Sequence, residues 1–313
     1  MIRTVLGDVP AAGFGPADYH EHLFQVSPLL TGDELDDETA SGEEALSLVT
    51  AGISAMVEAT PTGLGRNPAA VARISRATGL QVVHVTGAHR EEHYPAGHWL
   101  RDADDLTARF TADVTEGLPA EDSPARGPVA TGPDGEPVRA GMVKAGVGYW
   151  RISPFEQRVL AAVGETAAAT GVPVMVHLEY CSAAFEVLEL LAAQGVPAHR
   201  VVLAHVDRNL DPGLHAELAA VGAYLGFDGM ARHREAPDSA ILDDLEQLVT
   251  AGHTPRILLG GDVARRGRYR AYGGLPGLDY LPRRFLPRLT RRVGEDAVGE
   301  MLRHNPARLL TLS

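Results

Sequence analysis

Short apolar runs alternate with longer amphipathic segments along most of the chain. The apolar runs are typical of buried strands, whereas the amphipathic segments, bounded by Ser, Asn, Pro or Gly, are typical of helices. Eight strands are predicted, each followed by helical material, at residues 18–23, 53–59, 80–87, 141–149, 173–179, 200–207, 223–228 and 256–262.

Strands that alternate with helices imply parallel βαβ units, and eight such units in 313 residues match the size of a (β/α)8 TIM barrel. We therefore expect one α/β barrel domain over residues 1–313, preceded by a short N-terminal β segment. A doubly wound open sheet is the alternative, but no Gly-x-Gly-x-x-Gly follows the first strand, which disfavours its dinucleotide-binding form.

Local sequence motifs predict where some of the helices and turns begin or end. Ser41 is a candidate N-cap for a helix over 42–50, and Asn67 is a candidate N-cap for a helix that ends at Gly79. The segment 118–140 is rich in Pro, Gly and Asp, and its Pro-Asp-Gly turn predicts a hairpin-like excursion.

Composition narrows the class of protein. Hydrophobic content of 45% and charged content of 22% are typical of a globular chain, and a net charge of −13 disfavours nucleic acid and anionic membrane partners. Cys181 is the only cysteine, and neither a signal peptide nor an apolar run long enough to span a bilayer is present. We expect a cytoplasmic enzyme with a small-molecule substrate, for which a homodimer is one option.

Polar residues end several of the predicted strands, and in a (β/α)8 barrel functional side chains collect at these ends. They are His20, His22, Lys144, His177, His205 and Asp262. Hydrogen-bonded polar residues without further function are the alternative, but imidazoles and a carboxylate so arranged can hold two divalent ions, with zinc favoured over manganese or cobalt.

Lys144 is the unusual member of this set. A buried amine beside positive charge has a lowered pKa, and a neutral amine reacts with CO₂ to give a carbamate, an anion able to bridge two metals. In the alternative interpretation, the lysine stem packs in the strand and the amine reaches solvent.

The set resembles the phosphotriesterase family of the amidohydrolase superfamily, through His20-Glu21-His22-Leu23, the four later strand-end residues and Asn305-Pro306-Ala307-Arg308. The resemblance implies that His20, His22 and Asp262 hold a buried metal ion, and that His177 and His205 hold an exposed one. Lys144, N6-carboxylated, would bridge the two ions together with a hydroxide. Asp262 would be the catalytic residue that accepts the hydroxide proton and passes it to the leaving oxygen. Some relatives carry Glu at the lysine position.

The loops after the last two strands are rich in arginine, and these loops often bind phosphate in such barrels. A solvated, salt-bridged loop is the alternative. Phe227-Asp228-Gly229 and Tyr272-Gly273-Gly274 look like the family branch that hydrolyses phosphorylated sugar lactones. The resemblance implies substrate contacts from basic residues of these loops, and the candidates are Arg232, Arg234, Arg265 and Arg268, with Tyr269 in support.

Glu179 and Asp207 follow His177 and His205 by two residues and are expected on the same face, as substrate ligands or as supports of the histidines. The further histidines at 84, 89, 93 and 98 are expected to be structural or superficial.

The sequence thus predicts a binuclear-metal hydrolase that opens a sugar lactone, favouring a phosphorylated aldonolactone, by attack of a metal-bridging hydroxide. An unphosphorylated lactonase or carboxylesterase and an organophosphate hydrolase are the alternatives among enzymes. A metal-binding barrel without turnover is the alternative outside enzymes.

Overall fold

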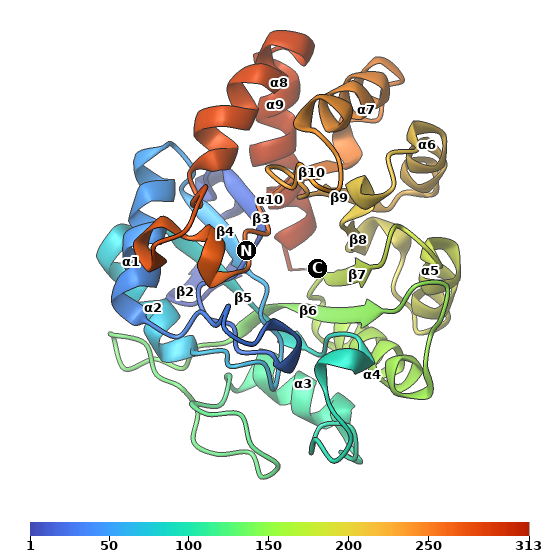
Figure 1. The fold of residues 1–313 in the computed structure, drawn as a ribbon. Coiled ribbons are helices and arrows are strands. Elements are labelled where there is room, and N and C mark those ends of the chain that lie inside the picture. The colour runs from blue at the N-terminus through green and yellow to red at the C-terminus, as the bar shows by residue number, and fades with distance from the viewer. Residues whose placement is uncertain (313) are drawn as a thin grey trace.

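Eight parallel strands follow one another around a barrel, and helices cover its outside (Figure 1). The computed structural model describes residues 1–312. The strands are β3 (Ala17–Glu21), β4 (Ala55–Glu58), β5 (Gln81–Gly87), β6 (Ala140–Val147), β7 (Val174–Leu178), β8 (Val201–Ala204), β9 (Tyr224–Phe227) and β10 (Ile257–Leu259). The prediction of a (β/α)8 barrel is confirmed.

The first and last strands meet where the barrel closes. Neighbours in the sheet run from β3 to β10 in chain order, and each pair is parallel. Beyond the end of β10, the backbone N–H of Asp262 donates to the carbonyl of His20 at 2.9 Å. This bond holds the ends of β3 and β10 together at the predicted ligand residues.

Most helices lie in the positions that the sequence predicts. They are α1 (Glu38–Thr50), α2 (Pro68–Thr78), α3 (Leu106–Thr115), α4 (Pro154–Thr170), α5 (Ala184–Ala193), α6 (Pro212–Val221), α7 (Asp238–Thr250), α8 (Leu286–Val293), α9 (Glu295–Gly299) and α10 (Asn305–Leu310). The expected cap of α2 is confirmed, because the Asn67 side chain accepts from the N–H of Ala70 at 3.1 Å.

The predicted start of α1 is wrong. The helix begins at Glu38, since the carboxylate of Asp37 accepts from the N–H groups of Thr39 and Ala40. Ser41 lies inside the helix, and its hydroxyl donates to the carbonyl of Leu23 at 2.6 Å. This serine therefore fastens α1 to the segment after β3.

Two further predictions concern the start of α5, which is wrong, and the excursion before β6, which is confirmed. Helix α5 begins at Ala184, two residues later than predicted, because Cys181 and Ala183 have φ of 57° and cannot continue a helix. The hairpin-like excursion is confirmed by isolated bridges that pair Pro119 with Val129 and Thr131 with Pro137.

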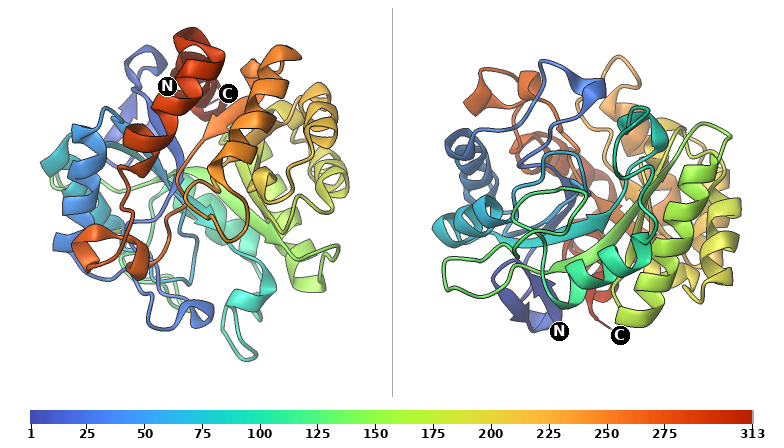
Figure 2. Two further views of the ribbon diagram at one scale, coloured as in Figure 1. Left: turned by 45° about the horizontal axis from the view of Figure 1, so that its top comes forward. Right: turned by 90° about the horizontal axis from the view of Figure 1, so that it is seen from below.

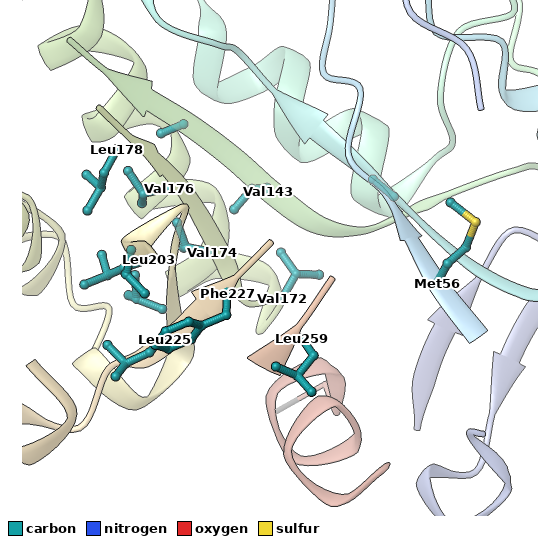
Figure 3. Close-up of a cluster of buried hydrophobic side chains, with 14 of the residues drawn as sticks. Met56, Val143, Val172, Val174, Val176, Leu178, Leu203, Leu225, Phe227 and Leu259 are labelled. Atoms are coloured by element: carbon teal, nitrogen blue, oxygen red, sulfur yellow. The ribbon is translucent and has the colours of Figure 1, made fainter. Parts of the chain in front are cut away.

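Two apolar layers explain which residues face the site. One fills the barrel and contains Val83, Met142, Met175 and Val202. The other lies between the sheet and the helices, and Figure 3 shows part of it, including Val143, Val174, Val176, Leu203 and Leu225. Successive strand residues alternate between the layers. Lys144 and His177, two residues beyond Met142 and Met175, thus face the barrel interior.

A small antiparallel sheet precedes the barrel, as predicted. It consists of β1 (Ile2–Thr4) and β2 (Gly7–Val9), and Ile2 also pairs with Thr311 near the C-terminus. Both termini lie at the same end of the molecule (Figure 2). Val5 N–H donates to the carbonyl of Val82 at 2.8 Å, near the start of β5, so this sheet covers the amino ends of the strands. Within residues 1–312, no helix has the length and apolar character needed to cross a membrane.

Candidate metal centre

Six buried polar side chains meet at the carboxyl ends of the strands, where they line one cavity of about 210 Å³. They are His20, His22, Lys144, His177, His205 and Asp262. The structure therefore brings together the whole set of ligands that the sequence predicts, although these residues are spread over more than two hundred positions of the chain.

Irregular backbone occurs at or beside four of these side chains. The pairing of β3 with β4 shifts register between Asp18 and Glu21, and Nε2 of His20 and of His22 lie 3.8 and 3.5 Å from Oδ1 of Asp262. Asp262 has a φ of 39° and His205 a φ of 63°. Left-handed backbone costs about 1–3 kcal/mol at a non-glycine residue, and such strain concentrates at functional sites.

Hydrogen bonds fix the tautomer of His22. Its Nδ1 lies 2.6 Å from Oγ1 of Thr60, and the Thr60 hydroxyl donates its own hydrogen to the carbonyl of Phe24 at 2.7 Å. The Thr60 oxygen therefore accepts, and Nδ1 of His22 carries the proton. The lone pair of Nε2 is left free on the side of Asp262.

His177 and His205 are fixed by carboxylates. Nε2 of His177 lies 2.7 Å from Oε1 of Glu179, and Nδ1 of His205 lies 2.6 Å from Oδ1 of Asp228. A carboxylate oxygen accepts in each contact, so each of these nitrogens carries the proton. Nδ1 of His177 is buried without a hydrogen-bond partner among the described residues. A buried, unpartnered lone pair beside other ligand atoms fits a metal ion.

The charge states of the candidate ligands at neutral pH also suit metal binding. Burial lowers the pKa of His22 to about 4 and the pKa of His205 to about 3, so both imidazoles are neutral. Burial opposes ionisation of Asp262, but Arg232 and nearby imidazoles hold the pKa of this carboxyl well below its usual range. Neutral imidazoles and an ionised carboxylate are the forms that bind metals.

Lys144 lies at the floor of the cavity. Its Nζ donates to the carbonyl of Ala59 at 2.8 Å and lies 3.4 Å from Nε2 of His20. Burial lowers the pKa of this amine to about 8. A substantial neutral fraction therefore exists near neutral pH, and the side chain does not reach solvent.

Two groups of three side chains are close enough to share an ion. Ligand atoms of His20, His22 and Asp262 lie within 4.8 Å of one another, and so do those of His20, His205 and Asp228. Asp228, however, already accepts from Tyr19 and His205, and it lies 3.2 Å from Nδ1 of His20. Because Asp228 is already engaged by neighbouring side chains, the first group is the better candidate for holding an ion.

Two of the predicted substrate-binding arginines line the cavity. The Arg232 guanidinium contacts the carboxylate of Asp262, and Arg265 lies at the rim with 48% of its side chain exposed. Arg90 and Arg208 line the same cavity, although the sequence did not single them out. These cations make the cavity attractive to an anion in a chain of net charge −13.

Three other candidates lie around this cavity rather than on its wall. Arg234 is exposed on the loop after β9. Arg268 donates to the carbonyls of Asp262 and Val263 at 3.4 and 3.3 Å, and the buried Tyr269 hydroxyl donates to the carbonyl of His22. Arg268 and Tyr269 thus hold the backbone that carries the ligands.

Glu179 and Asp207 differ in their surroundings. Glu179 lines the cavity, where it binds His177 and lies 3.3 Å from both Arg90 and Arg208. Asp207 accepts from the N–H of Gly229 at 2.7 Å and does not line the cavity. The expectation of a shared face fails for Asp207, because left-handed His205 breaks the strand alternation.

Sequence reasoning missed several residues of the site. Asp228 directly follows β9, and the rule that polar residues at strand ends are functional could have found it. His89 and His93, which were expected to be structural or superficial, line the cavity because the segment after β5 folds inward, and their rings lie 3.9 Å apart. No sequence signal marked this turn.

Comparison with known proteins points to one family. The sequence model of the phosphotriesterase family matches residues 1–310. A phospho-furanose lactonase of Mycoplasmopsis synoviae is 30% identical to this chain, over 99% of this chain and 91% of the relative.

Two solved structures are similar to this chain over most of its length. The lactonase Lmo2620 from Listeria monocytogenes superposes with a TM-score of 0.89 at 31% identity, covering 100% of this chain and 99% of the other. The phosphotriesterase homology protein from Escherichia coli, solved with phosphate in its active site, superposes with a TM-score of 0.83 at 28% identity, over 95% and 99% of the chains.

Proposed function

The chain belongs to the phosphotriesterase family of metal-dependent hydrolases, and we propose that it opens a sugar lactone that carries a phosphate group. One observation supports this proposal above the others. Three imidazoles whose tautomers leave one lone pair free face the same cavity as a group of arginines. The first feature suits metal-assisted hydrolysis, and the second suits an anionic substrate.

The ligands divide into two candidate ion positions. His20, His22 and Asp262 would hold one divalent ion, and His177 and His205 would hold a second, with Lys144 between them. Zinc is favoured because the donors are mainly imidazole nitrogens, while manganese and cobalt are alternatives. When bound, such ions lower the pKa of water and polarise the carbonyl of the substrate.

Lys144 would contribute as a carbamate. The lone pair of the neutral amine attacks the carbon of CO₂, and the nitrogen then loses a proton to solvent, which leaves an anionic oxygen pair on the side chain. The lowered pKa of Lys144 favours the attacking form. An anion at this position would also offset the positive charge of two divalent ions.

Asp262 is the candidate for moving the proton. Its carboxylate is ionised and lies at the end of β10, next to His20 and His22. It accepts the proton of the attacking water and donates it to the ring oxygen that leaves when the lactone opens. Arg232 contacts the same carboxylate and orients it.

Arg232 and Arg265 are the candidates for holding the substrate phosphate, because both line the cavity. The Escherichia coli relative binds phosphate in its active site, and the Mycoplasmopsis synoviae relative is a phospho-furanose lactonase. Arg268 and Tyr269 would support this region through the backbone. Glu179 would orient His177 and two arginines.

A substrate screen tests the proposal. Aldonolactones of varied stereochemistry and ring size, with and without a terminal phosphate, are assayed beside a phosphotriester, after the metal content of the protein has been measured. We expect about two metal ions per chain and faster opening of the phosphorylated lactones. Equal rates on both sets would favour the unphosphorylated lactonase, and turnover of phosphotriesters alone would favour the organophosphate hydrolase. Bound metal without turnover would indicate a non-catalytic barrel.

A further inference from the structure

Three neutral polar side chains that line the cavity have no role in the proposed chemistry: Gln25, His89 and His93. They come from the segments that follow β3 and β5. The two segments are joined where Nδ1 of His93 lies 2.8 Å from Oγ of Ser27. All three residues are at most 7% exposed, so a polar atom of theirs that has no partner in the protein can be paired only by the contents of the cavity.

The backbone determines which nitrogen of His89 is protonated. Nδ1 of His89 accepts from the N–H of Arg90 at 2.8 Å, so in the neutral ring the proton is on Nε2. Nδ1 also faces β6, since a Cβ added at Gly146 would lie 3.3 Å from it. Nε2–H is on the other side of the ring, directed away from the strand, and acts as a donor.

Gln25 supplies the complementary group. Its backbone pairs with Leu35 in both directions, at 2.9 and 2.8 Å, so the position of the residue is fixed. Its side-chain Oε1 is buried without a hydrogen-bond partner among residues 1–312. A buried acceptor left without a partner costs about 1–3 kcal/mol, which makes a ligand donor the natural partner.

The ring of His93 packs against the ring of His89. The two rings lie 3.9 Å apart, and the His89 ring lies 4.4 Å from that of His177. The Ser27 oxygen accepts from the N–H of Leu29 at 3.3 Å and holds Nδ1 of His93. His89 is thus held between a candidate metal ligand and an anchored neighbour.

We propose that Gln25 and His89 bind a ring hydroxyl group of the substrate, and that His93 positions His89. A hydroxyl group is both a donor and an acceptor, so it matches the acceptor Oε1 of Gln25 and the donor Nε2–H of His89. This inference rests on the proposed lactonase function and deepens it, because it assigns recognition of the hydroxylated ring to a neutral wall separate from the arginines.

The test compares one lactone with its deoxy analogues. A phosphorylated aldonolactone and a set of analogues, each lacking one ring hydroxyl, are assayed with wild-type protein, Gln25→Leu and His89→Phe. With wild type, we expect one analogue to lose about 10- to 100-fold in kcat/KM. Each variant should lose a similar factor on the full lactone and little further on that analogue.

His98→Phe is the matched control. His98 lies on the same loop and its Nδ1 also accepts a backbone N–H, from Leu100 at 3.2 Å, but it does not line the cavity. This variant should keep the wild-type discrimination among the lactones.

Gln25→Leu is the decisive variant for the hydroxyl subsite, because His89→Phe could also disturb His177. If Gln25→Leu lowers kcat/KM by the same factor on every lactone of the set, or leaves all of them unchanged, the subsite is overturned. A wild-type enzyme that opens none of these lactones overturns the proposed function instead, and the subsite with it.

Discussion

Nδ1 of His205 donates to Oδ1 of Asp228 at 2.6 Å, and this bond sets which nitrogen of the histidine can bind a metal. Oδ2 of the same carboxylate lies 3.2 Å from Nδ1 of His20. The residue directly after β9 therefore orients the imidazole that follows β8 through a hydrogen bond and lies beside the imidazole of β3. Its contribution is geometric, because its two oxygens are already engaged by these rings and by Tyr19.

Replacing this carboxylate should weaken metal binding. In Asp228→Asn the amide oxygen can serve only one ring, so we expect metal affinity to fall about 10- to 100-fold. Metal content after dialysis against a graded chelator series measures the effect. Asp207→Asn is the control, since the amide can still accept from Gly229 and does not face the ligands. Equal metal loss in both variants would contradict the orienting role.

Activity should require Lys144 in the form of its anionic carbamate. Lys144→Ala should lower kcat at least about 100-fold, because the bridge between the two ion positions is lost. Lys144→Glu should retain more activity, and its reconstitution should not depend on bicarbonate, whereas reconstitution of the wild type should. The measurement is activity after metal is restored with and without bicarbonate. Wild-type activity that is indifferent to bicarbonate, in CO₂-free buffer, would contradict the carbamate.

Arg265 should affect phosphorylated substrates alone. Arg265→Ala should raise KM about tenfold for a phosphorylated lactone, because one charge-assisted contact is worth about 1.5–3 kcal/mol at most. It should leave an unphosphorylated lactone unchanged. Arg266→Ala is the control, because this neighbouring arginine is similarly exposed but does not line the cavity. If both variants behave alike, the phosphate assignment of Arg265 is wrong.

Strand alternation and strand ends explain why much of the site could be predicted. A residue two positions beyond an inward-facing methionine must face inward, which placed Lys144 and His177 correctly. The barrel was predicted from the alternation of strands with helices and the family from the resemblance of its motifs, and both are confirmed. The metal ions, the carbamate and the individual roles of the ligands stay predictions.

The positions of Asp207, His89 and His93 depended on backbone conformations that the sequence pattern does not encode. Asp207 was expected to face the cavity, but the left-handed conformation of His205 turns the chain away after β8. His89 and His93 enter the cavity only because their loop folds back over β6, where Gly146 permits close approach. Departures from regular strand geometry concentrate at the site. They limited how well the sequence could predict which residues face the cavity.

His84 should make the stability of the protein depend on pH independently of the metal centre. It lies in β5, its Nδ1 contacts the carbonyl of Val85 at 2.8 Å, and its Nε2 has no hydrogen-bond partner among the described residues. Burial, and then Arg66, lower the pKa of this imidazole to about 3.

The unfolded chain binds a proton at this histidine below its ordinary pKa of about 6.5, whereas the folded chain does not until about pH 3. The free energy of unfolding should therefore fall as pH decreases below about 6.5, by up to about 1.4 kcal/mol per pH unit from this group. His84→Gln should flatten this dependence, measured by urea unfolding at several pH values with metal removed. His233→Gln, at an exposed position, is the control, and an unchanged slope in His84→Gln would refute the assignment.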